Sequence, residues 1–93
     1  MLLALEETEN ALVDFNRQQE RRDLLSTSAR ASEKAAELAR LRYQSGMADF
    51  LTVLDAERTL LEAQDRLAES ETRTATALIA VYKALGGGWE LQG

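Results

Sequence analysis

The groups of this 93-residue chain that could do chemistry are carboxylates and basic side chains, because it holds 16 Asp and Glu, 11 Lys and Arg, and no His or Cys. The commonest general base, the commonest zinc ligand and the best thiol nucleophile are therefore absent. Paired carboxylates remain able to act as acid and base, but the acidic residues are interleaved with Arg and Lys in a helical pattern, which is typical of a solvated face. The sequence predicts a protein that is not an enzyme and that uses no metal and no cofactor.

The charge and the hydropathy pattern argue against further classes of protein. A net charge of −5 opposes binding to nucleic acid, which needs a basic patch to displace counterions. No run approaches the roughly 20 apolar residues that a membrane-spanning helix requires. The start, Met1 to Glu7, lacks a basic segment and reaches two acids almost at once, unlike a signal peptide. We therefore expect no nucleic-acid partner, no membrane-spanning segment and no signal peptide in this chain.

The elements that must position these side chains are two helices. The chain has no Pro, and its five Gly lie at position 46, in the run 86–88 and at the end. Apolar residues recur at steps of three and four over about 2–44 and again over about 50–85, which predicts a helix in each range. The Gly run predicts a helix end at Leu85 and a Gly-rich tail over 86–93. The expected fold is all-α: a single antiparallel two-helix coiled-coil hairpin spanning 1–93.

A short turn is predicted over about 45–49. Gly46 suits the left-handed conformation that closes many helices, and Asp49 suits the N-cap of the next helix. Because the connection is short, the two helices should run antiparallel and touch.

The second helix carries three columns in strict seven-residue steps. They are Val53, Leu60, Leu67, Thr74 and Val81; Leu54, Leu61, Ala68, Ala75 and Tyr82; and Ala56, Ala63, Ser70, Ala77 and Ala84. Together they form a stripe wider than the two-position seam of a two-stranded coiled coil. One partner helix cannot cover it, so the pattern predicts neighbours on both flanks, as in a bundle, a sheet of helices or a closed helical barrel. We also expect the chain on its own to self-associate.

Two further segments are distinctive: the first is Arg42 to Gly46 followed by Phe50 to Leu60, and the second is Ala80 to Trp89. Together they resemble the C-terminal half of the outer membrane efflux protein family, the TolC-like outer membrane factors of Gram-negative bacteria. In the family the first spans the periplasmic turn between the last two long helices, and the second closes that helix pair at the equatorial region. The resemblance covers nearly the whole chain.

The resemblance implies a function in transport. Family members form homotrimeric channels with a barrel in the outer membrane and a helical tunnel in the periplasm. The chain would be a fragment of that periplasmic tunnel, part of the helical barrel of an outer membrane protein. It would form a passive exit duct that works with an inner-membrane pump and a periplasmic adaptor protein. Because it shows no barrel strands, we expect Met1 to fall within the long descending helix of a fragment or a truncated reading frame.

The resemblance also implies roles for three groups of residues. The tip, where the adaptor docks or the channel narrows, would be Tyr43, Gln44, Ser45, Gly46, Met47, Ala48 and Asp49. Residues that brace the tip would be Asp55 and Arg58, and an equatorial anchor would be Tyr82, Gly86, Gly87, Gly88 and Trp89. Some family members carry an Arg after the turn that holds the entrance closed, whereas Met47 to Asp49 occupy that stretch here.

Plainer roles compete at several of these positions. Tyr43 continues an apolar column and could simply pack, Asp49 could act as an ordinary cap, and Asp55 and Arg58 could pair along the helix surface. Trp89 could belong to a flexible tail or dock onto a larger domain. The alternative for the whole chain is a stand-alone helical coiled-coil interaction protein that self-assembles, which leaves the turn and the Gly-Gly-Gly-Trp ending unexplained.

Overall fold

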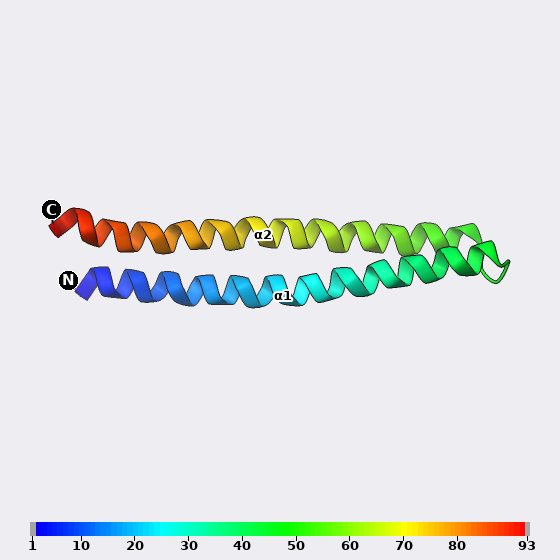
Figure 1. Cartoon of the computed structure of the whole chain (residues 1–93), viewed down its shortest axis with the longest axis horizontal. Helices are drawn as coiled ribbons and strands as arrows, with labels where there is room; N and C mark the ends of the chain where they lie inside the picture. The colour runs from blue at the N-terminus through cyan, green and yellow to red at the C-terminus, as the bar shows by residue number, and fades with distance from the viewer. Residues whose placement is uncertain (1, 93) are drawn as a thin grey trace. The chain divides into compact units, whose positions relative to one another are not determined.

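The computed structural model describes the backbone of residues 2–92 and the side chains of residues 5–86. Helix α1 spans Leu2–Gln44 and helix α2 spans Phe50–Gln92, with no strand in the described range (Figure 1). Residues 45–49 connect the two helices, so the predicted all-α hairpin is confirmed. Over the described residues, neither helix contains a stretch apolar enough to cross a membrane.

The C-terminal end of α2 differs from the sequence-based expectation. The helix continues to Gln92, whereas the Gly run predicted an end at Leu85 and a tail from residue 86. Each Gly lowers helix stability by about 1 kcal/mol relative to Ala, but it keeps the backbone N–H that Pro lacks. Gly86 keeps a negative φ, so it does not act as a left-handed stop. The side chains of residues 87–93 lie outside the described part.

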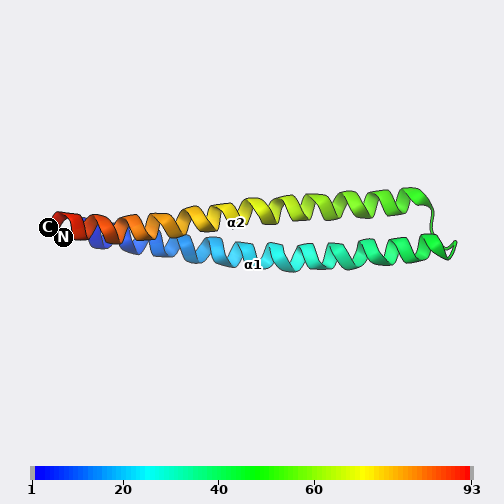
Figure 2. The same ribbon diagram turned by 45° about the horizontal axis from the view of Figure 1, so that its top comes forward.

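The chain divides into two compact units, and each is a pair of helical segments. Unit 1 comprises Met1–Arg22 and Ser70–Gly93, and unit 2 comprises Asp23–Glu69. Within each unit the α1 and α2 segments lie side by side and run in opposite directions (Figures 1 and 2). Each unit therefore has its own packed seam.

The seam of unit 2 is built from small side chains at alternating steps of three and four. Its buried members are Ala29, Ala36, Ala39, Val53 and Ala63. Leu25, Leu60 and Leu67 are half-buried at the same spacing. A sustained seven-residue repeat of this kind is the pattern of a coiled coil, and Ala at most core positions lets the two backbones approach closely.

The seam of unit 1 follows the same spacing but is more polar. On α2 it buries Ser70, Thr74, Ala77 and Val81. On α1 the half-buried residues Thr8, Ala11, Phe15 and Gln18 recur at steps of three and four. Ser70 and Thr74 are the buried polar side chains within the described range of residues.

One of the three columns predicted on α2 lies outside these seams. Leu54, Leu61 and Tyr82 are 47%, 61% and 65% exposed, and Ala68 and Ala75 are exposed as well. The other two columns supply the seam residues of both units. A single partner helix thus leaves part of the apolar stripe of α2 uncovered, as its width predicted.

Candidate functional site: the interhelical turn

The C-terminal end of α1 closes in a Schellman motif. Gly46 has φ of 78°, which confirms the predicted left-handed conformation. Its N–H donates to the carbonyl of Tyr43 at 3.1 Å, and the N–H of Met47 donates to the carbonyl of Arg42 at 2.7 Å. These are the two bonds that define the motif, and they satisfy carbonyls that the end of a helix leaves free. The turn therefore has one defined backbone conformation.

Asp49 caps the N-terminal end of α2. Its Oδ1 accepts hydrogen bonds from the Thr52 hydroxyl at 2.8 Å and from the Thr52 backbone N–H at 3.0 Å. Both bonds stabilise the carboxylate, and together they hold the pKa of Asp49 below its ordinary value. Capping alone accounts for this geometry.

Two aromatic rings close the base of the turn. Tyr43 on the last turn of α1 and Phe50 at the start of α2 have ring centroids 5.5 Å apart and planes tilted by 55°. The tilted arrangement and the 5.5 Å separation lie within the range of favourable aromatic pairs. Tyr43 nevertheless remains 47% exposed and Phe50 53% exposed, so the pair braces the turn while presenting surface to solvent.

The turn itself presents its side chains outward. Met47 is 80% exposed, and Gln44, Ser45 and Asp49 are also exposed, while Ala48 is half-buried. The Ser45 hydroxyl folds back onto the carbonyls of Leu41 and Arg42 at 3.0 and 3.2 Å. The sequence-predicted tip residues thus lie together on one stiff projection with little bulk.

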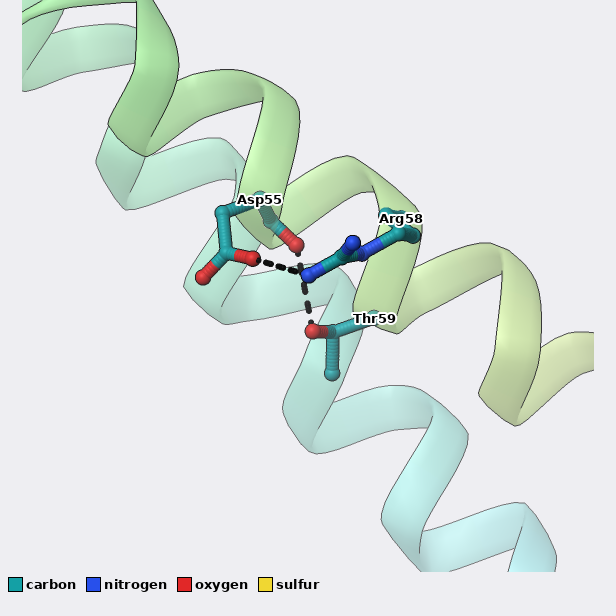
Figure 3. A network of polar contacts seen from close by, with 3 residues as sticks. All are labelled: Asp55, Arg58 and Thr59. Carbon is teal, nitrogen blue, oxygen red and sulfur yellow. Dashed lines mark hydrogen bonds and ion pairs between the residues drawn. The ribbon is translucent and has the colours of Figure 1, made fainter.

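The predicted bracing pair forms within α2. Arg58 Nη2 lies 2.7 Å from Asp55 Oδ1, and the Thr59 hydroxyl donates to the main-chain carbonyl of Asp55 at 3.1 Å (Figure 3). The side chains of Asp55 and Arg58 are 68% and 72% exposed, so the ion pair contributes little to stability. The pair does not bridge α1 and α2, because both partners belong to α2.

A cross-helix ion pair and a groove mark the two flanks of unit 2. On one flank Arg40 Nε lies 3.0 Å from Glu57 Oε1. On the other flank an open groove of about 270 Å³ runs beside the turn. It is lined by Ala35, Leu38, Ala39, Arg42, Ala48, Thr52, Asp55 and Ala56. A second hollow of about 250 Å³ lies on α2 beside Asp55 and Arg58, with Leu51 and Leu54.

The predicted equatorial residues lie in unit 1 and are not gathered around the turn. Tyr82 is 65% exposed and Gly86 is half-buried in α2. The side chain of Trp89, with Gly87 and Gly88, falls outside the described residues. Across the described part of the chain, no group of three or more carboxylates is placed to hold a metal ion. What the described residues do present is exposed surface at the turn and in the groove beside it.

Sequence reasoning missed three contacts. They are the Tyr43–Phe50 ring pair, the Arg40–Glu57 ion pair and a hydrogen bond from Thr74 to Gln18. The ring pair had a signal, since two aromatic residues flank a five-residue turn. The other two depend on which α1 residue faces which α2 residue, and periodicity within each helix does not determine that pairing.

The chain is similar to known outer membrane channels. The profile of the outer membrane efflux protein family matches residues 1–87. The pyoverdine export outer membrane protein OpmQ of Pseudomonas putida is 40% identical over 86 residues, and outer membrane protein OprJ of Pseudomonas aeruginosa is 32% identical over 87. These alignments cover 92% and 94% of the chain. The outer-membrane channel OprN superposes with a TM-score of 0.80 at 46% identity over 95% of the chain.

The chain is much shorter than these relatives. It spans 18% of OpmQ and of OprJ, and 20% of the OprN chain. The matched part of each relative is therefore about a fifth of a longer protein.

Proposed function

Because this chain belongs to the outer membrane efflux protein family, we propose that it forms part of the periplasmic wall of an outer membrane efflux channel. In this role the hairpin lines a passive exit duct within a homotrimer, and the energy for transport comes from an inner-membrane pump. The relatives are named for export of pyoverdine and as outer membrane proteins, which supports a transport role.

The observation that carries this proposal is the pair of uncovered apolar stripes in unit 2. On α1, Leu24 and Leu38 are 73% and 49% exposed, and Leu38 lines the groove flank. On α2, Leu54 and Leu61 are exposed. They lie three residues before and four residues after Glu57, so they share the flank of the Arg40–Glu57 ion pair. The stripes therefore lie on opposite flanks.

Stripes on opposite flanks favour a wall of helices. A helix pair with one exposed stripe would bury it in a dimer and stop there. A pair with a stripe on each flank needs a neighbour on both sides, and repetition of that contact builds a sheet of helices that can close into a ring. A tunnel wall satisfies this requirement.

We further propose that the turn docks the hairpin of a periplasmic adaptor protein. The Schellman motif and the Asp49 cap hold the turn in one conformation, Met47 projects from it, and the small Ser45 side chain folds back onto α1. A rigid projection of small and adaptable side chains suits close approach by a partner backbone. Each contact is small, so useful affinity requires repetition around a symmetric ring.

Substitution of the tip in a full-length channel that contains this segment tests the docking role. Ser45→Trp combined with Ala48→Trp should abolish drug efflux while trimer assembly and outer membrane insertion stay intact. Lys34→Trp, at an exposed position on α1 away from the turn, is the matched control and should leave efflux unchanged. Unchanged drug resistance in the double variant, at normal protein level, would remove the docking role from this turn.

A further inference from the structure

One segment of α2 in unit 1 is rich in side chains that weaken helices. Over residues 70–76, called here the hydroxyl-rich segment, α2 carries Ser70, Thr72, Thr74 and Thr76 at alternate positions. A β-branched Thr loses rotamer freedom in a helix, and Ser and Thr hydroxyls compete for backbone hydrogen-bonding groups. The Thr74 hydroxyl does so here, because it donates to the main-chain carbonyl of Ser70 at 2.8 Å. Helix propensity is therefore low over this segment.

The seam beneath the hydroxyl-rich segment is polar as well. Ser70 and Thr74 are 2% and 5% exposed, so the segment buries hydroxyl-bearing residues and little apolar surface. The Thr74 hydroxyl also reaches the main-chain carbonyl of Gln18 on α1 at 3.2 Å, but Gln18 Oε1 and Ser70 Oγ are buried without a hydrogen-bond partner. A buried polar atom that loses water without gaining a partner lowers stability. Packing against α1 therefore compensates poorly for the low helix propensity.

A segment of α1 in unit 2 provides an internal comparison. Residues 26–28 are Ser, Thr and Ser, and the Thr27 hydroxyl donates to the main-chain carbonyl of Asp23 at 3.1 Å. Helix propensity is thus low here too. The seam residues on either side are apolar, however, since Leu25 is half-buried and Ala29 is buried. The two segments share their weak helix formers and differ in the polarity of the seam.

We infer that the hydroxyl-rich segment opens locally while the hairpin stays folded, with α2 losing its helical turns over residues 70–76. Weak helix formers and a polar seam act on the same residues, and few buried apolar contacts are the physical mark of a segment that opens below the free energy of global unfolding. Residues 17–22 of α1 are Arg, Gln and Glu, which are good helix formers, so α1 keeps its helix at the level of Gln18. This inference is independent of the proposed transport function.

Backbone hydrogen exchange followed by NMR tests local opening residue by residue. The measured quantity is the protection factor, the ratio of the intrinsic exchange rate of an amide to its observed rate. Amides of residues 70–76 should have protection factors at least about tenfold lower than those of residues 26–29. Both segments are measured in the same molecules, so solution conditions cannot produce the difference.

A seam variant, Gln18→Leu combined with Ser70→Ala, tests the cause. It removes the two unpartnered polar atoms and leaves the Thr74 hydrogen bond to residue 18 possible, because the acceptor there is a main-chain carbonyl. Protection over residues 70–76 should rise at least about fivefold, since apolar side chains at these positions stabilise the seam. Protection over residues 26–29 should stay within about twofold of the parent value, because opening of that segment does not involve the substituted residues.

The matched control makes the same two changes at exposed positions of unit 2. Gln64→Leu combined with Ser28→Ala should leave protection over residues 70–76 unchanged. A rise there equal to that of the seam variant would show that the polar seam is not the cause.

Further results would also overturn the inference. One is equal protection of the two segments in the parent chain. Another is unchanged protection over residues 70–76 in the seam variant. A third is an equal rise over both segments, because the substitutions would then act on global unfolding. The last is loss of helix content by circular dichroism in the seam variant, which would show that the polar side chains hold the seam together.

Discussion

Gly46 is the residue on which the turn depends. Its φ of 78° lies where an L side chain is strained, although a Cβ added there would meet no atom within 4 Å. The cost of substitution is therefore conformational and not steric. Gly86 provides the contrast. A Cβ added there would also meet no atom within 4 Å, but its φ is negative, as in a helix.

Gly46→Val should destabilise the hairpin by roughly 1–2 kcal/mol or more, because the left-handed region costs an L residue about that much and a β-branched residue more. Thermal unfolding followed by circular dichroism measures the change. Gly86→Ala is the control and should stabilise α2 by roughly 0.5–1 kcal/mol, as expected for Ala in a helix interior. Equal melting temperatures for Gly46→Val and the parent chain would contradict the role of the turn.

Asp49 gives the turn a dependence on pH. Its pKa is lowered from 3.8 in the folded chain by the hydroxyl and backbone hydrogen bonds of Thr52. A carboxyl group with a depressed folded pKa contributes stability that is present above the unfolded value and is lost as pH falls through the folded value. The contribution of Asp49 should therefore be complete above about pH 4 and fade below it.

Asp49→Asn tests this dependence, because Asn keeps an acceptor at the N-cap but does not titrate. Unfolding curves between pH 7 and pH 2 should show a smaller acid-dependent loss of stability in the Asn variant than in the parent chain. Glu62→Gln, on an exposed surface of the same helix, is the control and should behave like the parent. Identical pH profiles for the parent and Asp49→Asn would show that the cap does not titrate as its hydrogen bonds require.

At the scale of the helices, each one has a buried seam and an uncovered stripe beside it. In unit 2 the seam consists mainly of Ala, so the pair brings the backbones close but buries little area per residue. The larger side chains Leu54 and Leu61 remain at the surface. Contiguous exposed apolar stripes of this kind mark interaction surfaces.

The chain on its own should form dimers or larger species at micromolar concentration, because these stripes have no cover within the hairpin. Sedimentation measures the mass. Leu54→Gln combined with Leu61→Gln should shift the population toward monomer, whereas Arg58→Gln, on the same helix outside the stripe, should not. A well-folded parent monomer with a cooperative melt would contradict the prediction.

Much of this architecture was predictable from the sequence. The two helices, the left-handed Gly46, the Asp49 cap and the Asp55–Arg58 pair all follow from local spacing and backbone chemistry. The predicted end of α2 at Leu85 was wrong, because a Gly run weakens a helix without preventing it. The choice between neighbouring stripes of α2 was not predictable from periodicity, since both repeat every seven residues.

At the scale of the whole molecule, the proposed function places the uncovered stripes against neighbouring helices of a channel wall. The chain spans about a fifth of the length of these relatives. The stripes on α1 and α2 of unit 2 would then be covered on assembly, while the turn stays accessible to a partner.

Cysteine labelling in the assembled full-length channel tests this assignment most directly. Leu54→Cys and Leu61→Cys should react with a water-soluble maleimide at least about tenfold more slowly than Asp65→Cys, an exposed polar position on the same helix, because packed neighbours exclude the reagent. After denaturation all three should react at the same rate. Equal labelling of all three positions in the intact channel would contradict the account, because it would leave the apolar stripe of α2 without a neighbour.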